Sequence, residues 1–306
     1  MERSWPDPRR AAVERSGLGF SYELEYEDVA EGFRSDLGFV PRTGIRTAVQ
    51  ELRFSRYPGS TLNSVTASLE MGGVWDRGGE RLDWGIEPGL LFVFPRRSGV
   101  ELLYRWRRER LTPADAPGLE ADADFAPSHL EASVWASPFS QVAAGATYTA
   151  GRGINFNPAP GEPPAEGGLR ETWLELTLRP FAPLEIHTVY VRSTLASPSG
   201  DRVFLDEIVR SRWSWQLTRE LSLRTILRYD RTLPDPALTS IPRRRNLNAD
   251  FLFTYLVHPG TALHLGYNHD ARDRELLDDP PRLVPREALG TEGRQLFFKL
   301  SYLVRF

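Results

Sequence analysis

The chain has 306 residues, a formal net charge of −3 at pH 7 and no cysteine, which excludes a disulfide scaffold and a thiolate metal site. The near-neutral net charge also lacks the excess of positive charge that is typical of a nucleic-acid-binding protein. A hydrophobic fraction of 41% with no run approaching about 18 apolar residues excludes a transmembrane helix. A membrane β-barrel needs no such run, because only alternate residues of its strands face lipid.

The first segment, residues 1–17, lacks the apolar core of about 7–15 residues that a secretory signal peptide needs. An exported barrel needs such a signal, so it was removed, or the chain is a fragment, or the membrane interpretation is wrong. We expect residues 1–17 to form a periplasmic N-terminal segment and residues 18–306 a transmembrane β-barrel, possibly the C-terminal part of a larger one. A cytoplasmic all-β protein stays open as the alternative.

Period-two patterning and β-branched or aromatic residues predict about fourteen strands along the chain, and no long helical period competes with them. In chain order we expect strands at 18–28, 45–56, 61–75, 82–94, 99–111, 128–138, 141–150, 170–179, 183–193, 203–216, 221–231, 246–257, 261–270 and 294–306. The sequence therefore predicts an all-β fold, an antiparallel up-and-down transmembrane β-barrel.

The expected connections alternate between short and longer. The short ones are 57–60, 95–98, 139–140, 180–182, 217–220 and 258–260, and the longer ones are 29–44, 76–81, 112–127, 151–169, 194–202, 232–245 and 271–293. Outer-membrane barrels have tight periplasmic turns and longer extracellular loops, whereas a Greek-key sandwich has no reason for this asymmetry. With a periplasmic C-terminus, the long connections would face outward.

One predicted strand could carry catalytic groups. His129, Glu131 and Ser133 alternate along 128–138 and supply a base, a carboxylate and a nucleophile. On one strand, His129 and Ser133 would lie roughly 13 Å apart at ~3.3 Å per residue, so a neighbouring strand would have to supply a partner. We therefore assign no catalytic residue and keep a barrel hydrolase as the third hypothesis. We also expect no cofactor and no metal.

Charged side chains occupy the face of the strands opposite the apolar one. A dry barrel interior could not hold so many ions, whereas a water-filled lumen could. The residues expected to line it are Glu101, Arg105, Arg107, Glu109, Glu171, Glu175, Arg179, Arg210, Arg212, Arg224, Arg228, Asp230, Asp250 and Lys299. The pattern favours a porin-like channel for small polar solutes. The alternative is a lumen plugged by ion pairs, in a barrel whose loops serve binding or secretion.

The last strand alternates apolar and polar side chains and ends the chain on an aromatic residue. Its apolar face includes Phe298, Leu300, Tyr302, Val304 and Phe306, which we expect to act as the assembly signal. This ending resembles the terminal strand of bacterial outer-membrane β-barrels. The resemblance implies location in the outer membrane of a Gram-negative bacterium. It also implies that the partners are membrane lipid, lipopolysaccharide and the barrel assembly machinery, with no nucleic acid.

Two segments, 33–46 (FRSDLGFVPRTGIR) and 297–306 (FFKLSYLVRF), resemble the C-terminal barrel region of a poorly characterised bacterial family. Longer members of that family carry an N-terminal domain similar to the family-nine carbohydrate-binding modules. The resemblance spans most of the chain and implies a membrane location, but it carries over no substrate and no functional residue.

Overall fold

The computed structural model describes residues 9–33, 42–116, 118–278 and 281–303. Among these residues, no helix is long and apolar enough to cross a membrane. The regular structure of the described residues consists of β-strands. The strands are β1 (Arg9–Arg15), β2 (Phe20–Val29), β3 (Ile45–Arg56), β4 (Ser64–Asp76), β5 (Arg81–Phe94), β6 (Ser98–Leu111), β7 (Ala123–Phe125), β8 (Ser128–Phe139), β9 (Val142–Asn155), β10 (Ala165–Phe181), β11 (Leu184–Ala196), β12 (Arg202–Gln216), β13 (Leu221–Pro234), β14 (Arg244–His258), β15 (Thr261–Asp278) and β16 (Pro281–Tyr302).

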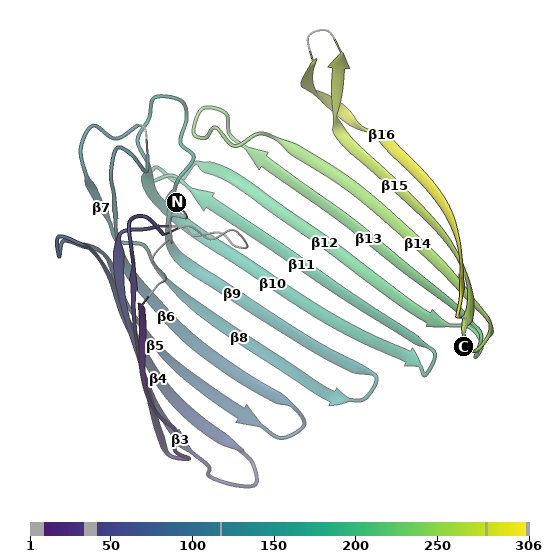
Figure 1. The fold of residues 1–306 in the computed structure, drawn as a ribbon, viewed down its shortest axis with the longest axis horizontal. Coiled ribbons are helices and arrows are strands. Elements are labelled where there is room, and N and C mark those ends of the chain that lie inside the picture. Colours follow the sequence, from purple (N-terminus) through teal and green to yellow (C-terminus); the bar gives the residue numbers. More distant parts are fainter. Residues whose placement is uncertain (1–8, 34–41, 117, 279–280, 304–306) are drawn as a thin grey trace, which may run out of the picture. The chain divides into compact units, whose positions relative to one another are not determined.

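The strands form a 16-stranded sheet in which each strand neighbours the next one in the chain, while the short β7 lies off this path against β6 (Figure 1). The strand pairs with assigned register are antiparallel, as in the pair β12 and β13. The predicted all-β, antiparallel, up-and-down architecture is confirmed. β1 and β16 stand at the two ends of the strand order, so the sheet is not closed among the described residues.

The chain divides into two compact units. Unit 1 comprises residues 1–95, 99–133 and 149–169, and unit 2 comprises residues 96–98, 134–148 and 170–306. Each unit is a layer of sheet whose side chains alternate between two faces, because successive residues of a strand point to opposite sides. Since directly opposed residues share a face, the register of the strands decides which side chains meet.

In unit 2, one face is apolar. One row of directly opposed residues across β12–β16 consists of Trp213, Thr225, Phe251, Tyr267 and Leu296. The next row consists of Trp215, Leu223, Phe253, Leu265 and Phe298. Leu296 is 71% exposed and Phe298 68% exposed, so nothing in the described structure covers these large side chains. A water-soluble sheet would bury such a face under a second layer.

Unit 1 has the same arrangement. Leu24, Phe54, Leu90 and Tyr104 are exposed along its apolar face. The rings of Trp84 and Trp106 meet edge to face at 4.5 Å, and the guanidinium group of Arg81 lies 5.1 Å from the Trp84 ring. Aromatic rings beside a cation suit a boundary between an apolar and an aqueous phase.

Few apolar side chains are buried among the described residues, and those few do not form a layer between sheets. In unit 2 they include Leu195, Val203 and Leu205, which lie toward the ends of β11 and β12, and Ala271, which lies opposite Leu247 near the start of β14. The connections 197–201 and 235–243 join strands at this same end of the sheet, which we call the long-loop end. Leu184, at the start of β11, is also buried but lies at the opposite end of the sheet, so the buried apolar side chains of unit 2 gather mainly at the long-loop end.

Four details differ from the expectation. β1 occupies residues 9–15, inside the segment expected to precede the barrel, and pairs with β2. β7 adds a short strand within 112–127. Residues expected as the long connection 271–293 instead extend β15 and β16 into one hairpin, which the alternation of 261–270 alone could not reveal. The connection 57–63 is longer than 77–80, so the alternation of connection lengths fails at this point.

Candidate functional site

The polar face of unit 1 carries a row of glutamates that crosses five strands. Glu14 lies opposite Glu23, Glu23 opposite Glu51, Glu51 opposite Glu70, and Glu70 opposite Glu87. Adjacent strands are about 4.8 Å apart, so the row brings like charges close together. Sequence analysis did not predict this row, because the row depends on the pairing register of five strands.

Arginines compensate part of that charge. Glu87 accepts hydrogen bonds from the Nε of Arg105 at 3.1 Å and from the Nη2 of Arg107 at 2.6 Å. Arg105 also donates from Nη1 to Glu131 at 2.7 Å. These contacts connect β5, β6 and β8 on the polar face of unit 1. Two of the predicted lumen residues, Arg105 and Arg107, thus belong to one ion-pair cluster.

The catalytic candidates His129, Glu131 and Ser133 lie on β8, at alternate positions that share a face. Arg105 binds the Glu131 carboxylate, so this carboxylate has a structural partner. His264 and His269 point to opposite faces of β15, since five positions separate them. Their Nδ1 atoms lie 3.2 Å from Thr254 Oγ1 and 3.2 Å from Tyr267 Oη, respectively.

The other predicted lumen residues lie on the polar side of the strands, and several take part in cross-strand contacts. Ser193 donates to Glu171 at 2.9 Å, and Arg179 donates to Glu185 at 3.0 Å. Glu175 lies 3.5 Å from His187. The strand pairing places Arg210 opposite Arg228, Arg212 opposite Ile226, Ser214 opposite Arg224, Asp250 opposite Asn268 and Lys299 opposite His264. Glu101 and Glu109 lie on β6, with Arg105 and Arg107, in unit 1.

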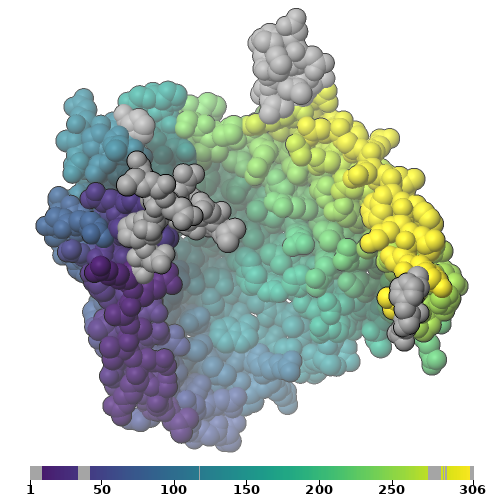
Figure 2. All heavy atoms as spheres, in the orientation of Figure 1, coloured from purple at the N-terminus to yellow at the C-terminus, as the bar shows by residue number. Residues whose placement is uncertain are grey.

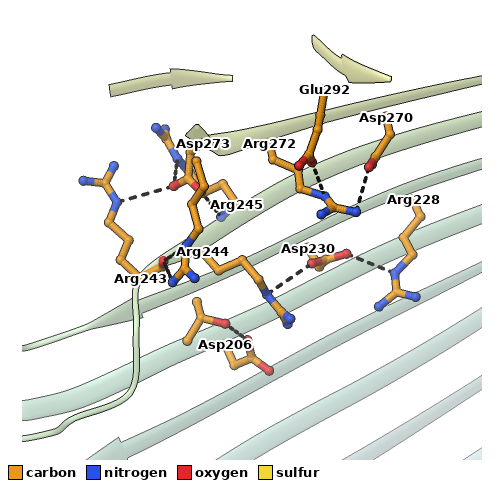
Figure 3. Close-up of polar contacts among 12 residues, drawn as sticks. Asp206, Arg228, Asp230, Arg243, Arg244, Arg245, Asp270, Arg272, Asp273 and Glu292 are labelled. Carbon is orange, nitrogen blue, oxygen red and sulfur yellow. Dashed lines mark hydrogen bonds and ion pairs between the residues drawn. The ribbon is translucent and has the colours of Figure 1, made fainter. Parts of the chain in front are cut away.

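A cluster of arginines and carboxylates lies at the long-loop end of β13–β16 in unit 2 (Figure 3). Its first centre is Asp273, which accepts from the backbone N–H of Arg245 at 2.8 Å and from Arg245 Nε at 3.2 Å. Arg243 Nε lies 3.8 Å from the same carboxylate. The Asp273 side chain is 2% exposed, so its charge is stabilised by these arginines rather than by water.

The second centre is Asp230 on β13. Arg228 Nε donates to it at 3.0 Å, and Arg244 Nε lies 3.8 Å away. Arg272 on β15 contacts two further carboxylates. Its Nη2 lies 2.8 Å from Asp270, and its Nε lies 2.7 Å from Glu292. The cluster therefore ties β13, β14, β15 and β16 together by side-chain contacts as well as by the backbone ladder.

Sequence analysis found Arg228 and Asp230 but not the rest of this cluster. Arg243, Arg244 and Arg245 lay in the expected connection 232–245, and Arg272 and Glu292 lay in the expected connection 271–293. The sequence signal that could have pointed to the site is the run of three consecutive arginines at 243–245. Asp273 could not be found, because its burial depends on the hairpin extension of β15.

The predicted assembly residues Phe298, Leu300 and Tyr302 lie on β16 and are 68%, 59% and 67% exposed. Figure 2 shows β16 in yellow, at the edge of the drawn surface. Val304 and Phe306 lie outside the described residues. The large exposed side chains of β16 leave this edge strand with an uncovered apolar face.

No family model matches the chain, and no curated protein matches it. Among solved structures, a ferric enterobactin receptor (PfeA) mutant from Pseudomonas aeruginosa is 11% identical, with a TM-score of 0.49 over 88% of this chain and 51% of that one. The chain thus spans about half the length of that receptor. OmpT, an outer membrane protein of Vibrio cholerae, is 9% identical, with a TM-score of 0.33 over 97% of this chain and 99% of that one. The CymD monoaromatic hydrocarbon channel is 9% identical, with a TM-score of 0.25 over 86% and 77%.

Proposed function

We propose that the chain is a β-barrel protein of the bacterial outer membrane that conducts small polar solutes through a charged lumen. The observation that carries this proposal is the opposite chemistry of the two faces of the sheet. One face exposes Trp213, Phe253 and Phe298. The other face carries charged side chains, such as Arg210 on β12 and Arg228 directly opposite it on β13. Lipid suits the first face and water suits the second.

The membrane location follows from the same physics. An exposed apolar face of this extent is stable only against hydrocarbon or another apolar surface. The partners of this face would be membrane lipid and lipopolysaccharide, and the β16 strand would bind the barrel assembly machinery. Within a membrane, every backbone donor and acceptor must be paired, so β1 and β16 both need a partner strand. The resemblance to a family with a carbohydrate-binding-module-like domain stays a prediction.

The test is a planar-bilayer recording of protein that has been refolded and checked for heat-modifiable migration on a gel. A channel should give discrete conductance steps whose size rises with salt concentration. If folded protein inserts into the bilayer and gives no conductance, the proposal of a channel is rejected. Omitting the protein and adding protein denatured by heat are the two controls for detergent artefacts.

A second candidate function, a plugged barrel that presents its loops for binding or secretion, is favoured by the ion-pair cluster of Glu87, Arg105 and Glu131. Such cross-strand pairs could fill a lumen without leaving a path for solutes. In that case, deletion of 112–127 or 235–243 should abolish the phenotype that the intact protein confers on the cell, while the protein still folds. An unchanged phenotype after both deletions would count against this candidate.

A further inference from the structure

A pocket opens within the arginine cluster at the long-loop end of β13–β15. Its volume is about 330 Å³, which suits a small ligand. Its lining consists of Arg228, Asp230, Arg244, Arg245, Asn246, Arg272, Asp273, Arg274 and Glu292. Five arginines face three carboxylates in this set, which leaves an excess of two positive charges. We propose that this pocket binds a small multivalent oxyanion, a solute that carries phosphate or carboxylate groups.

Two of the three carboxylates are buried, whereas three of the five arginines are about half exposed. The side chains of Asp230 and Asp273 are 5% and 2% exposed. Those of Arg228, Arg244 and Arg272 are 49%, 57% and 49% exposed. Asp230 and Asp273 therefore lie beneath the guanidinium groups that they contact, whereas Glu292 is 39% exposed and lies at the surface beside Arg272. An approaching solute meets positive charge first.

Side-chain geometry supports an oxyanion in particular. A guanidinium group carries five N–H donors in a planar fork, which matches the oxygens of a phosphate or a carboxylate. Arg244 is held through Nε to Asp230 at the long distance of 3.8 Å, and Arg274 is held by the carbonyl oxygen of Arg243 at 2.7 Å. Neither contact is a bidentate pair with a carboxylate. These two arginines are oriented without being fully neutralised.

The strand register explains why the cluster holds together without a ligand but would gain from one. Arg272 on β15 lies opposite Asn246 on β14. Arg244, opposite Thr232, is two residues from Asn246 on β14 and shares its face, so two arginines flank Asn246. The gathered guanidinium groups repel each other, and a bound anion would relieve that repulsion. The inference names the class of solute for the proposed channel, and to that extent it rests on the proposed function.

The experiment is isothermal titration calorimetry of the full chain, refolded in a non-ionic detergent at low salt, with sodium pyrophosphate as the probe. We expect the wild type to bind, and we expect Arg244→Gln and Arg272→Gln each to weaken binding about tenfold or more, since each removes a charge-assisted contact. Among the described residues, Arg274 contacts the backbone carbonyl of Arg243 rather than a carboxylate, so Arg274→Gln gives the same test with less risk to folding. Higher salt should weaken binding by the wild type.

Arg219→Gln is the matched control, because it removes one positive charge from the connection 217–220 at the opposite end of β13. Its affinity for pyrophosphate should stay within about twofold of the wild type, a difference of well under 1 kcal/mol. No binding by the wild type, or equal affinities for the control and all three cluster variants, would overturn the proposal.

A phosphate group could also come from a lipid, so a parallel titration uses short-chain phosphatidic acid in the same detergent. Binding of this lipid without binding of pyrophosphate would overturn the proposal that the ligand is a soluble oxyanion. Channel recordings distinguish the two proposals: pyrophosphate binding without conductance rejects the channel and keeps the site. Conductance without pyrophosphate binding rejects the site and keeps the channel.

Discussion

At the scale of single residues, the glutamate row of unit 1 places Glu70 directly between Glu51 and Glu87. Glu87 has two arginine partners, and Arg53 donates to Glu51 at 2.6 Å. Like charges directly opposite each other destabilise a pair of strands by roughly 0.2–1 kcal/mol. Repulsion between Glu70 and its two glutamate neighbours therefore lowers the stability of the folded protein.

Glu70→Gln should raise the free energy of unfolding by roughly 0.2–1 kcal/mol, because glutamine keeps the shape of the side chain and removes the repulsion. Urea unfolding of the protein in lipid vesicles, followed by tryptophan fluorescence, measures the change. Glu87→Gln is the matched control one strand away, and it should lower stability because it breaks the pairs with Arg105 and Arg107. A loss of stability in Glu70→Gln would contradict the argument.

A second residue-scale prediction concerns Asp115 in the connection between β6 and β7. Its carboxylate accepts from the backbone N–H of Thr112 at 3.0 Å and from Thr112 Oγ1 at 2.9 Å. The backbone hydrogen bond, followed by the hydroxyl, holds the pKa of Asp115 below its ordinary value. The folded pKa is the lower one, so this turn gains stability above the ordinary pKa and loses it as pH falls through the folded pKa.

Asp115→Asn should therefore speed proteolysis of the 112–127 connection at neutral pH, where the wild-type carboxylate is charged. The difference should vanish under acid conditions, below the folded pKa, where the wild-type group is protonated. Limited proteolysis with an acid-tolerant protease across pH, read by mass spectrometry, gives both rates. Equal rates at neutral pH would show that the carboxylate does not stabilise this turn.

At the scale of the elements, each long strand separates lipid-compatible from water-compatible side chains by alternation alone. On β13, Leu227 lies between Ser211 and Ala249 on the apolar face, and Ile226 lies between Arg212 and Asp250 on the polar face. Sequence patterning predicted this separation for most strands, because it needs nothing beyond the two-residue repeat. It could not predict how far β15 and β16 extend, since 271–293 has no clean repeat.

Leu227→Arg should lower the stability of the inserted protein by roughly 2–4 kcal/mol if the apolar face contacts the middle of the bilayer. Ile226→Arg is the matched control on the same strand, and its cost should be much smaller because the polar face would contact water and Asp250 offsets the like charge of Arg212. Urea titration in vesicles measures both. Equal costs, or a larger cost for Ile226→Arg, would show that the apolar face does not contact lipid.

At the scale of the whole molecule, the strand order leaves β1 and β16 as its end members. An end strand in lipid has one row of backbone groups without partners, which is prohibitive in hydrocarbon. We therefore expect both end strands to be paired when the protein is inserted, whether within the chain or with another chain.

Hydrogen exchange measured by mass spectrometry tests this expectation. In lipid nanodiscs, the amides of 9–15 and 294–302 should exchange about as slowly as those of the central strand β12. Urea-unfolded protein provides the fully exchanging reference. Fast exchange at both end strands in folded, inserted protein would mean that their edges stay open, and a membrane-spanning sheet would then be untenable.

The sequence by itself determined the β class, the up-and-down order and the two faces of the strands, because a repeat of two residues is local. Arg105, Arg107, Arg228 and Asp230 were recognised on the polar face for that reason. Only the tertiary structure decided which of these charges meet. The glutamate row and the buried Asp273 with its arginines depend on pairing register and on the extended β15–β16 hairpin, and a shift of one residue in register would turn every side chain of a strand to its other face.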